Sequence, residues 1–156
     1  MSSSAIEDRL AGLGITLPLP AAPVANYVPF TLHQGIVTIS GQLPLSEGKL
    51  FAVGRLGAEV DVDVGRAAAR LCFINLLAQL RAACEGDLGR VTRVLRLGGF
   101  IASAPDFTQH ALVMNGASDL AVEVFGDIGR HARSTVGVAG LPLGAAVEVE
   151  GSFAIA

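Results

Sequence analysis

The residues best placed to do chemistry lie near the end of the chain, where charged side chains interrupt two apolar segments. Residues 131–138 read His-Ala-Arg-Ser-Thr-Val-Gly-Val, and residues 145–150 read Ala-Ala-Val-Glu-Val-Glu. A turn midway between the segments would pair them as a closing antiparallel hairpin and place Arg133 opposite Glu148. The face that they share must then meet water, a ligand or another subunit. The alternative explanation is an ordinary ion pair on a solvated sheet surface.

The alternation of side chains along a strand divides this expected hairpin into two faces. Thr135 would lie beside Arg133 and Glu150 beside Glu148 on the polar face. The other face would pack against helices through Val147, Val149, Phe153 and Ile155.

Other catalytic and ligand-binding patterns are missing from the sequence. The potential metal ligands are scattered and have no metal-site spacing: His33, His110, His131, Cys72 and Cys84. No nucleophile elbow surrounds Ser40, and no glycine-rich nucleotide motif occurs. The single lysine, Lys49, lies in a polar turn that does not suit Schiff-base chemistry. We therefore expect neither a metal nor a cofactor.

Length and composition favour one domain that associates with copies of itself. The chain has 156 residues, of which 51% are hydrophobic and 16% charged, and its mean hydropathy is +0.56. This apolar excess is high for a small monomer, so part of it is expected at a subunit interface. The net charge of −3 and the lack of a dense basic run make nucleic acid an unlikely partner.

The sequence shows no sign of export or membrane insertion. Residues 1–10 lack the basic-then-apolar order of a signal peptide, and prolines interrupt the charge-free run at residues 11–46. Both cysteines fall in one expected helix, too far apart along its axis to form a disulfide. These features predict a reduced, cytoplasmic protein without a membrane segment.

Hydrophobic spacing indicates the elements that must position the charged strands. Residues 1–21 are expected to form an N-terminal extension, with a short helix at 5–14 and a proline-rich arm at 17–23, ahead of a domain at 22–156. Strands are expected at residues 26–32, 36–42, 50–53, 91–103, 132–138 and 146–155, the first two as a hairpin. A long helix is expected at 61–84, and a loop that begins at residue 105 should lead into a second helix that reaches residue 125.

Two similar turns follow the two long helices. Residues 86–90 read Gly-Asp-Leu-Gly-Arg, and residues 126–130 read Gly-Asp-Ile-Gly-Arg. Each glycine pair can end a helix and return the chain to the sheet. The echo predicts two βαβ-like halves in one sheet, which gives an α+β fold with the helices on one face.

Several segments carry a resemblance to a known family. The strand end Ser-Gly-Gln-Leu-Pro at 40–44, the pattern Ala-Arg-Ser-x-Val-x-Val-x-x-Leu-Pro at 132–142 and Val-Glu-Val-Glu at 147–150 resemble the YjgF/RidA family of reactive-intermediate deaminases. Asn-Tyr-Val at 26–28 and Asn115 also fit its pattern. The resemblance implies a chorismate-mutase-like α+β domain with a mixed six-stranded sheet and two helices on one face. It also implies a homotrimer with its ligand clefts between subunits.

The family resemblance also implies an activity and roles for individual residues. Its members hydrolyse enamine and imine intermediates, such as 2-aminoacrylate, to 2-keto acids and ammonia without a cofactor. Arg133 matches the arginine that binds the substrate carboxylate, and Glu148 matches the acid that orients the attacking water. Further positions that match the ligand cleft are Tyr27, which would reach it from a neighbouring subunit, Ser40, Gly41, Asn115 and Thr135.

Departures from the family pattern leave other functions open. Thr135 stands where the deaminases usually have cysteine, and the segment 105–114 is longer by about three residues. His110 lies in that segment and could approach the cleft, although the sequence reveals no partner for it. A divergent branch of this kind could instead be a non-catalytic sensor of small carboxylates. The endoribonuclease or translation-inhibitor activity reported for some relatives is disfavoured by the acidic pI of about 5.5.

Overall fold

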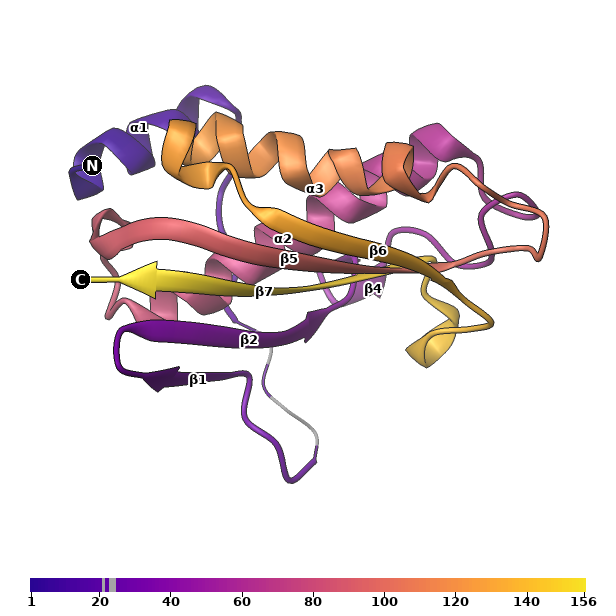
Figure 1. Ribbon diagram of the computed structural model, residues 1–156, viewed down its shortest axis with the longest axis horizontal. Helices are drawn as coiled ribbons and strands as arrows, with labels where there is room; N and C mark the ends of the chain where they lie inside the picture. Colours follow the sequence, from indigo (N-terminus) through magenta and orange to yellow (C-terminus); the bar gives the residue numbers. More distant parts are fainter. Residues whose placement is uncertain (21, 23–24) are drawn as a thin grey trace.

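Two long helices cover one face of a twisted sheet (Figure 1). The computed structural model describes residues 1–20, 22 and 25–156. The helices are α2 (Val62–Ala83) and α3 (His110–Phe125), and they pack against each other. The sheet has the order β1-β2-β7-β5-β6 and consists of β1 (Phe30–His33), β2 (Ile36–Gln42), β5 (Val91–Ala102), β6 (Ala132–Val138) and β7 (Val147–Ile155).

Helix α2 forms where the hydrophobic spacing predicts a helix. Asp61 caps its N-terminus, because the side-chain oxygen accepts a hydrogen bond of 2.9 Å from the Val64 amide. The apolar residues form a wide arc that is buried against both α3 and the sheet, and its largest members are Phe73, Leu76, Leu77 and Leu80. Cys72 and Cys84 are both buried, and they form no disulfide, as the sequence predicts.

The two glycine turns connect helix to strand as expected. After α2, Gly86 adopts a φ of +93° before a 3₁₀ turn, η1 (Leu88–Arg90), which leads into β5. After α3, Gly126 adopts a φ of +68° at the start of η2 (Gly126–Gly129), which precedes β6. Strands β5 and β6 run parallel, so β5-α3-β6 is a βαβ unit. In the other half, β7 lies between β2 and β5 and runs antiparallel to both.

The predicted closing hairpin is wrong. Strands β6 and β7 do not pair, because β5 lies between them and bonds to β6 on one edge and β7 on the other. The crossover through α3 makes β6 the parallel neighbour of β5, which leaves only the opposite edge of β5 for β7. The link between β6 and β7 contains a short 3₁₀ turn, η3 (Pro142–Gly144), and crosses the end of β5.

Smaller differences concern the ends of the predicted elements. The main sheet of the described residues has five strands, because the segment at 50–53 supplies only β4 (Lys49–Leu50), which pairs with β3 (Leu45–Ser46) in a separate ribbon. The first hairpin is confirmed, but β1 begins at residue 30 rather than 26. The boundary of the N-terminal extension, and residues 21 and 23 of the arm, lie outside the described residues.

The N-terminal segment begins with a helix that packs on the rest of the fold (Figure 1). Helix α1 (Ser3–Gly12) buries Ile6 and Leu10. Its Arg9 donates a hydrogen bond of 3.0 Å from Nη1 to the Val124 carbonyl near the end of α3. Among the residues that the structure describes, no helix combines the length and apolar character needed to cross a membrane.

The crossing of α2 and α3 gives a stability prediction. Gly116 in α3 lies so close to α2 that a Cβ there would collide with the Arg66 carbonyl group. Alanine favours a helix over glycine by roughly 1 kcal/mol, yet overpacking of this kind costs about 1–3 kcal/mol. We expect Gly116→Ala to lower the free energy of unfolding measured by denaturant titration.

Gly12→Ala is the matched control, since a Cβ at this helical position meets nothing within 4 Å. It should be neutral or slightly stabilising. Equal or greater stability of Gly116→Ala relative to the wild type would contradict the close packing of α2 on α3.

Candidate functional site

Arg133 extends from β6 toward α3. Its Nη1 donates to Ser118 Oγ at 3.0 Å, and its Nη2 donates to the Ala111 carbonyl at 3.3 Å. Asn115 lies on the same side of α3, because it is one helical turn from each of these two residues. The sequence-predicted residues Arg133 and Asn115 are thus brought together on the helix-covered side of the sheet.

Thr135 follows Arg133 in the same row of β6. It pairs with Gly99 of β5, where a Cβ would lie only 2.6 Å from the Met114 sulfur of α3, so this row faces the helices. The Thr135 hydroxyl is buried and has no hydrogen-bond partner within the described part of the chain. A buried polar atom in this state is unusual and is consistent with a ligand or a partner surface completing the site. Arg133, Thr135 and Asn115 are called the Arg133 cluster below.

Glu148 lies on the other side of the sheet, close to a second group of predicted residues. A Cβ on Gly41 would lie 2.8 Å from the Glu148 carboxyl carbon, so the carboxylate covers the backbone of Gly41. Next to it, Ser40 Oγ donates to the Val28 carbonyl at 2.9 Å and so fixes the loop that carries Tyr27. Glu148 and Gly41, together with Ser40 beside Gly41 in the chain and Tyr27 on the loop that Ser40 holds, are called the Glu148 cluster.

The two clusters lie on opposite faces of one sheet, so the predicted cross-strand pair is wrong. Arg133 pairs with Leu97 of β5, whereas Glu148 pairs with Phe100 on the other edge of that strand. Arg133 and Thr135 therefore point toward α3, and Glu148 and Glu150 point to the uncovered face. The expected partition of β7 is confirmed, because its other row is buried under the helices: Val147, Val149, Phe153 and Ile155.

The surroundings of Glu148 disfavour its ionised form. Partial burial raises the pKa of the Glu148 carboxyl above its ordinary value of 4.5, and the nearby Glu150 carboxylate raises it further. Glu148 is therefore a stronger base than a solvated glutamate, which suits a group that accepts a proton near neutral pH.

Sequence reasoning missed Ser118 and His131. His131 Nδ1 donates to the Gly129 carbonyl at 2.6 Å, and its Nε2 lies 2.9 Å from the same Ser118 oxygen that accepts from Arg133. Burial is the main reason that the pKa of His131 is lowered from 6.5. The alternation of side chains along an extended segment could have indicated His131, because it is two residues from Arg133 and so lies on the same side of the chain.

His110 does have a partner. Its Nε2 lies 3.2 Å from Ser103 Oγ, and its ring meets the Phe107 ring edge to face at a centroid distance of 5.1 Å. The longer segment after β5 thus folds into a wall beside Gly137 of β6, where a hollow of about 360 Å³ opens. His110 is the first residue of α3, whereas His131 contacts Ser118 in the middle of that helix.

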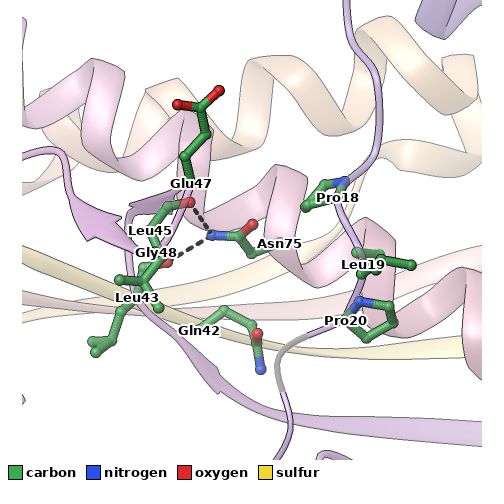
Figure 2. Close-up of a pocket in the computed structure, with 10 residues that line it drawn as sticks. Pro18, Leu19, Pro20, Gln42, Leu43, Leu45, Glu47, Gly48 and Asn75 are labelled. Carbon is green, nitrogen blue, oxygen red and sulfur yellow. Dashed lines mark hydrogen bonds between the residues drawn. The ribbon is translucent and has the colours of Figure 1, made fainter.

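A further hollow of about 280 Å³ lies between the N-terminal arm and α2, and none of the seven predicted site residues lines it (Figure 2). Asn75 of α2 donates from Nδ2 to the Leu43 and Leu45 carbonyls at 2.9 and 3.0 Å. The polar residue in the apolar arc of α2 thus anchors the loop after β2, while Pro18, Leu19 and Pro20 form the opposite wall.

The part of the chain that the structure describes contains no group of three or more His, Cys, Asp or Glu side chains placed to hold a metal ion.

Comparison with known proteins places this geometry in a family. A model described as YjgF/chorismate mutase-like, putative endoribonuclease, matches residues 7–151. Protein TCP17 of Trypanosoma cruzi is 48% identical over 151 residues, which cover 96% of this chain and 94% of that protein.

Solved structures agree with this match. The crystal structure of Atu1372 from Agrobacterium tumefaciens, a protein of unknown function, is similar with a TM-score of 0.93 at 48% identity, covering 99% of this chain and 94% of that one. The YjgF gene product of E. coli is similar with a TM-score of 0.60 at 25% identity, covering 89% and 94%. The fold is therefore that of the YjgF/chorismate-mutase-like class. The chain belongs to the YjgF/RidA family.

The raised pKa of Glu148 predicts a pH-dependent contribution to stability. A carboxyl whose pKa is raised on folding binds its proton more tightly in the folded state, so stability falls as the pH rises from about 4.5 through the folded pKa. We expect Glu148→Gln to have a higher free energy of unfolding than the wild type at pH 7, with the difference vanishing below pH 4.5.

Denaturant titrations at several pH values measure this difference. Glu123→Gln, which removes an exposed carboxylate of α3, is the control and should follow the wild-type profile. A Glu148→Gln variant that is less stable than the wild type at pH 7 would show that the carboxylate is favourably paired instead.

Proposed function

We propose that this protein hydrolyses small imino acids, and the enamines in equilibrium with them, to 2-keto acids and ammonia in a cleft formed by two copies of the chain. The observation that carries the proposal is the state of Arg133. Its guanidinium is held by two neutral acceptors, Ser118 and Ala111, and borders a hollow of about 300 Å³.

A carboxylate fits the free part of this guanidinium. Arginine has five N–H donors, of which Ser118 and the Ala111 carbonyl use two. The remaining donors are enough for a bidentate contact. Because neither acceptor is charged, the positive charge of Arg133 stays available for an anion. Asn115 and the Thr135 hydroxyl supply further polar groups next to it.

Two copies are needed to bring a base to that carboxylate. Within one chain the Glu148 cluster faces away from Arg133, so the water-activating group must come from a neighbour. Exposed apolar side chains lie next to both clusters: Leu112, which follows Ala111, is 43% exposed, and Val28, whose carbonyl accepts from Ser40, is 54% exposed. A contact between unlike surfaces of identical chains forms a ring when its rotation closes, and we propose the closed homotrimer that the family resemblance implies.

The proposed reaction requires only water and proton transfers, so no cofactor takes part. Arg133 holds the carboxylate of the imino acid, and Glu148 of the next subunit accepts a proton as water adds to the imine carbon. The resulting carbinolamine expels its nitrogen, which takes up protons and leaves as ammonia, while the hydroxyl becomes the keto group. Tyr27, Ser40 and Gly41 would line the side of the cleft that carries Glu148.

A carboxylate sensor without catalysis would use the same Arg133, so the decisive measurement is turnover. An imino acid generated by an amino-acid oxidase can be followed as 2-keto acid release with and without the protein. Acceleration supports the deaminase. Binding of 2-ketobutyrate without acceleration supports the sensor, and tight RNA binding without carboxylate binding would support the ribonuclease activity of some relatives.

Substitutions of Arg133 and Glu148 should have different effects on ligand binding and turnover. We expect Arg133→Ala to weaken carboxylate binding and turnover together, by about 2–5 kcal/mol, and Arg133→Lys to restore little because one ammonium cannot reproduce the fork. Glu148→Gln should keep binding of 2-ketobutyrate within a few fold and lower kcat by roughly 10²-fold. Calorimetry and the coupled assay measure the two effects.

Arg81→Ala, in the last turn of α2, is the matched control and should behave as the wild type. Unchanged turnover in Glu148→Gln, with only a loss of thermal stability in Arg133→Ala, would reduce both residues to structural roles.

Subunit mixing tests whether the cleft combines two copies. Arg133→Ala and Glu148→Gln chains are each expected to be inactive, but in mixed trimers about a quarter of the clefts regain an intact Arg133 and an intact Glu148. Light scattering of the wild type should give three times the 16.0 kDa chain mass.

Co-expressed tagged chains of both variants should therefore recover activity that neither has alone. A stable monomer of 16.0 kDa, or mixed trimers without activity, would exclude the two-copy cleft.

A further inference from the structure

A chain of hydrogen bonds leads from Arg133 into the protein. Ser118 Oγ accepts from Arg133 Nη1 at 3.0 Å and lies 2.9 Å from His131 Nε2, while His131 Nδ1 lies 2.6 Å from the Gly129 oxygen. Ser118, His131 and Arg133 border the same hollow of about 300 Å³.

The hydrogen positions in this series of hydrogen bonds follow from the groups at its two ends, the Gly129 carbonyl and Arg133. The Gly129 carbonyl can only accept, so the hydrogen of a neutral His131 is on Nδ1 and its Nε2 is bare. The Ser118 hydroxyl must then donate to Nε2, which leaves the lone pairs of its oxygen facing Arg133. In this arrangement Ser118 has no hydrogen to offer to a ligand.

The surroundings of His131 disfavour its charged form while Arg133 has no ligand. Burial is the main cause that lowers the pKa of His131, and the Arg133 charge lowers it further. Two other charged groups border the hollow, Arg130 and Asp119. Each of these charges already has an ion-pair partner. Arg130 lies 3.5 Å from Asp127, and Asp119 lies 3.8 Å from Arg66 of α2.

We propose that Ser118 and His131 form a proton relay for the carboxylate site: a carboxylate bound by Arg133 draws one proton onto His131, and Ser118 then donates its hydroxyl hydrogen to the ligand. This inference rests on the proposed role of Arg133. It makes Ser118 a further ligand-binding residue and His131 a positioning residue that acts through it.

The proton balance of this step is simple. The bound carboxylate offsets the Arg133 charge, which removes one of the causes that disfavour the imidazolium. His131 Nε2 then takes a proton from the buffer and becomes a donor to Ser118 Oγ. The Ser118 hydrogen is displaced from Nε2 and turns to the ligand, while Arg133 keeps its charge throughout. Because such coupling is reciprocal, protonation of His131 must strengthen carboxylate binding by the same factor by which carboxylate binding strengthens proton binding to His131.

Calorimetric titration of the full chain with 2-ketobutyrate tests the relay, since this acid stays ionised between pH 5.5 and 8. Titrations in two buffers with different ionisation enthalpies report the protons taken up. We expect uptake on binding, and affinity that rises about fivefold or more as the pH falls through this range. His131→Asn should still bind 2-ketobutyrate, but it should take up fewer protons on binding, and its affinity should depend less on pH.

Two comparisons separate the relay from other sources of protons. Glu148 also has a raised pKa, so uptake that survives in His131→Asn and disappears in Glu148→Gln belongs to that carboxyl and overturns the relay. Ser103→Ala removes a hydroxyl that lies 3.2 Å from His110 Nε2, the same kind of pair at the first residue of α3, and should leave the uptake unchanged.

The wild-type protein gives an independent measurement if His131→Asn fails to fold. The chain has three histidines, so their ring resonances can be titrated individually by NMR. The pKa of His131 should rise when 2-ketobutyrate is added. No rise in the pKa of His131 under saturating ligand would overturn the relay. Arg133→Ala with unchanged binding would instead refute the proposed function itself.

Discussion

The position of β5 between β6 and β7 decides where the charged side chains of the sheet point. This strand is hydrogen-bonded along both edges, to the parallel strand β6 on one side and to the antiparallel strand β7 on the other. Because paired residues share a face, Leu97 sets the direction of Arg133, and Phe100 sets that of Glu148. Leu97 is fully buried under the helices, so Arg133 has to point toward α3, whereas Glu148 projects from the uncovered face.

This constraint leaves each chain with two separated parts of a polar site. One part lies between β6 and α3, and the other lies over β2 and β7, where Gly41 makes room for the Glu148 carboxylate. Exposed apolar side chains lie beside both parts, namely Leu112 next to Ala111 and Val28 at the Ser40 hydroxyl. A chain that is 51% hydrophobic has ample apolar surface for an interface, and an interface is also what would bring the two parts into one cleft.

The lack of an ion pair to Arg133 among the described residues matters as much as its hydrogen bonds. An internal ion pair would hold the guanidinium in place but would also cancel its charge. Ser118 and the Ala111 carbonyl hold it without cancelling that charge, so the arginine is oriented and still able to attract an anion. His131 adds a titratable group to this arrangement without contacting Arg133 directly, since Ser118 lies between them in the hydrogen-bond chain.

The sequence by itself determined the local elements and the family. The spacing of apolar residues predicted α2 and the buried row of β7, and the paired glycines predicted the two turns, because each depends on residues that are close along the chain. Local patterns also singled out Arg133 and Glu148 as the unusual charges. Only the tertiary structure decided which strands are neighbours, since hydrogen bonding between strands depends on the path of the α3 crossover rather than on the turn between residues 138 and 147. The same holds for Ser118: nothing near it in sequence marks it, and it lies between Arg133 and His131 only because α3 packs along β6.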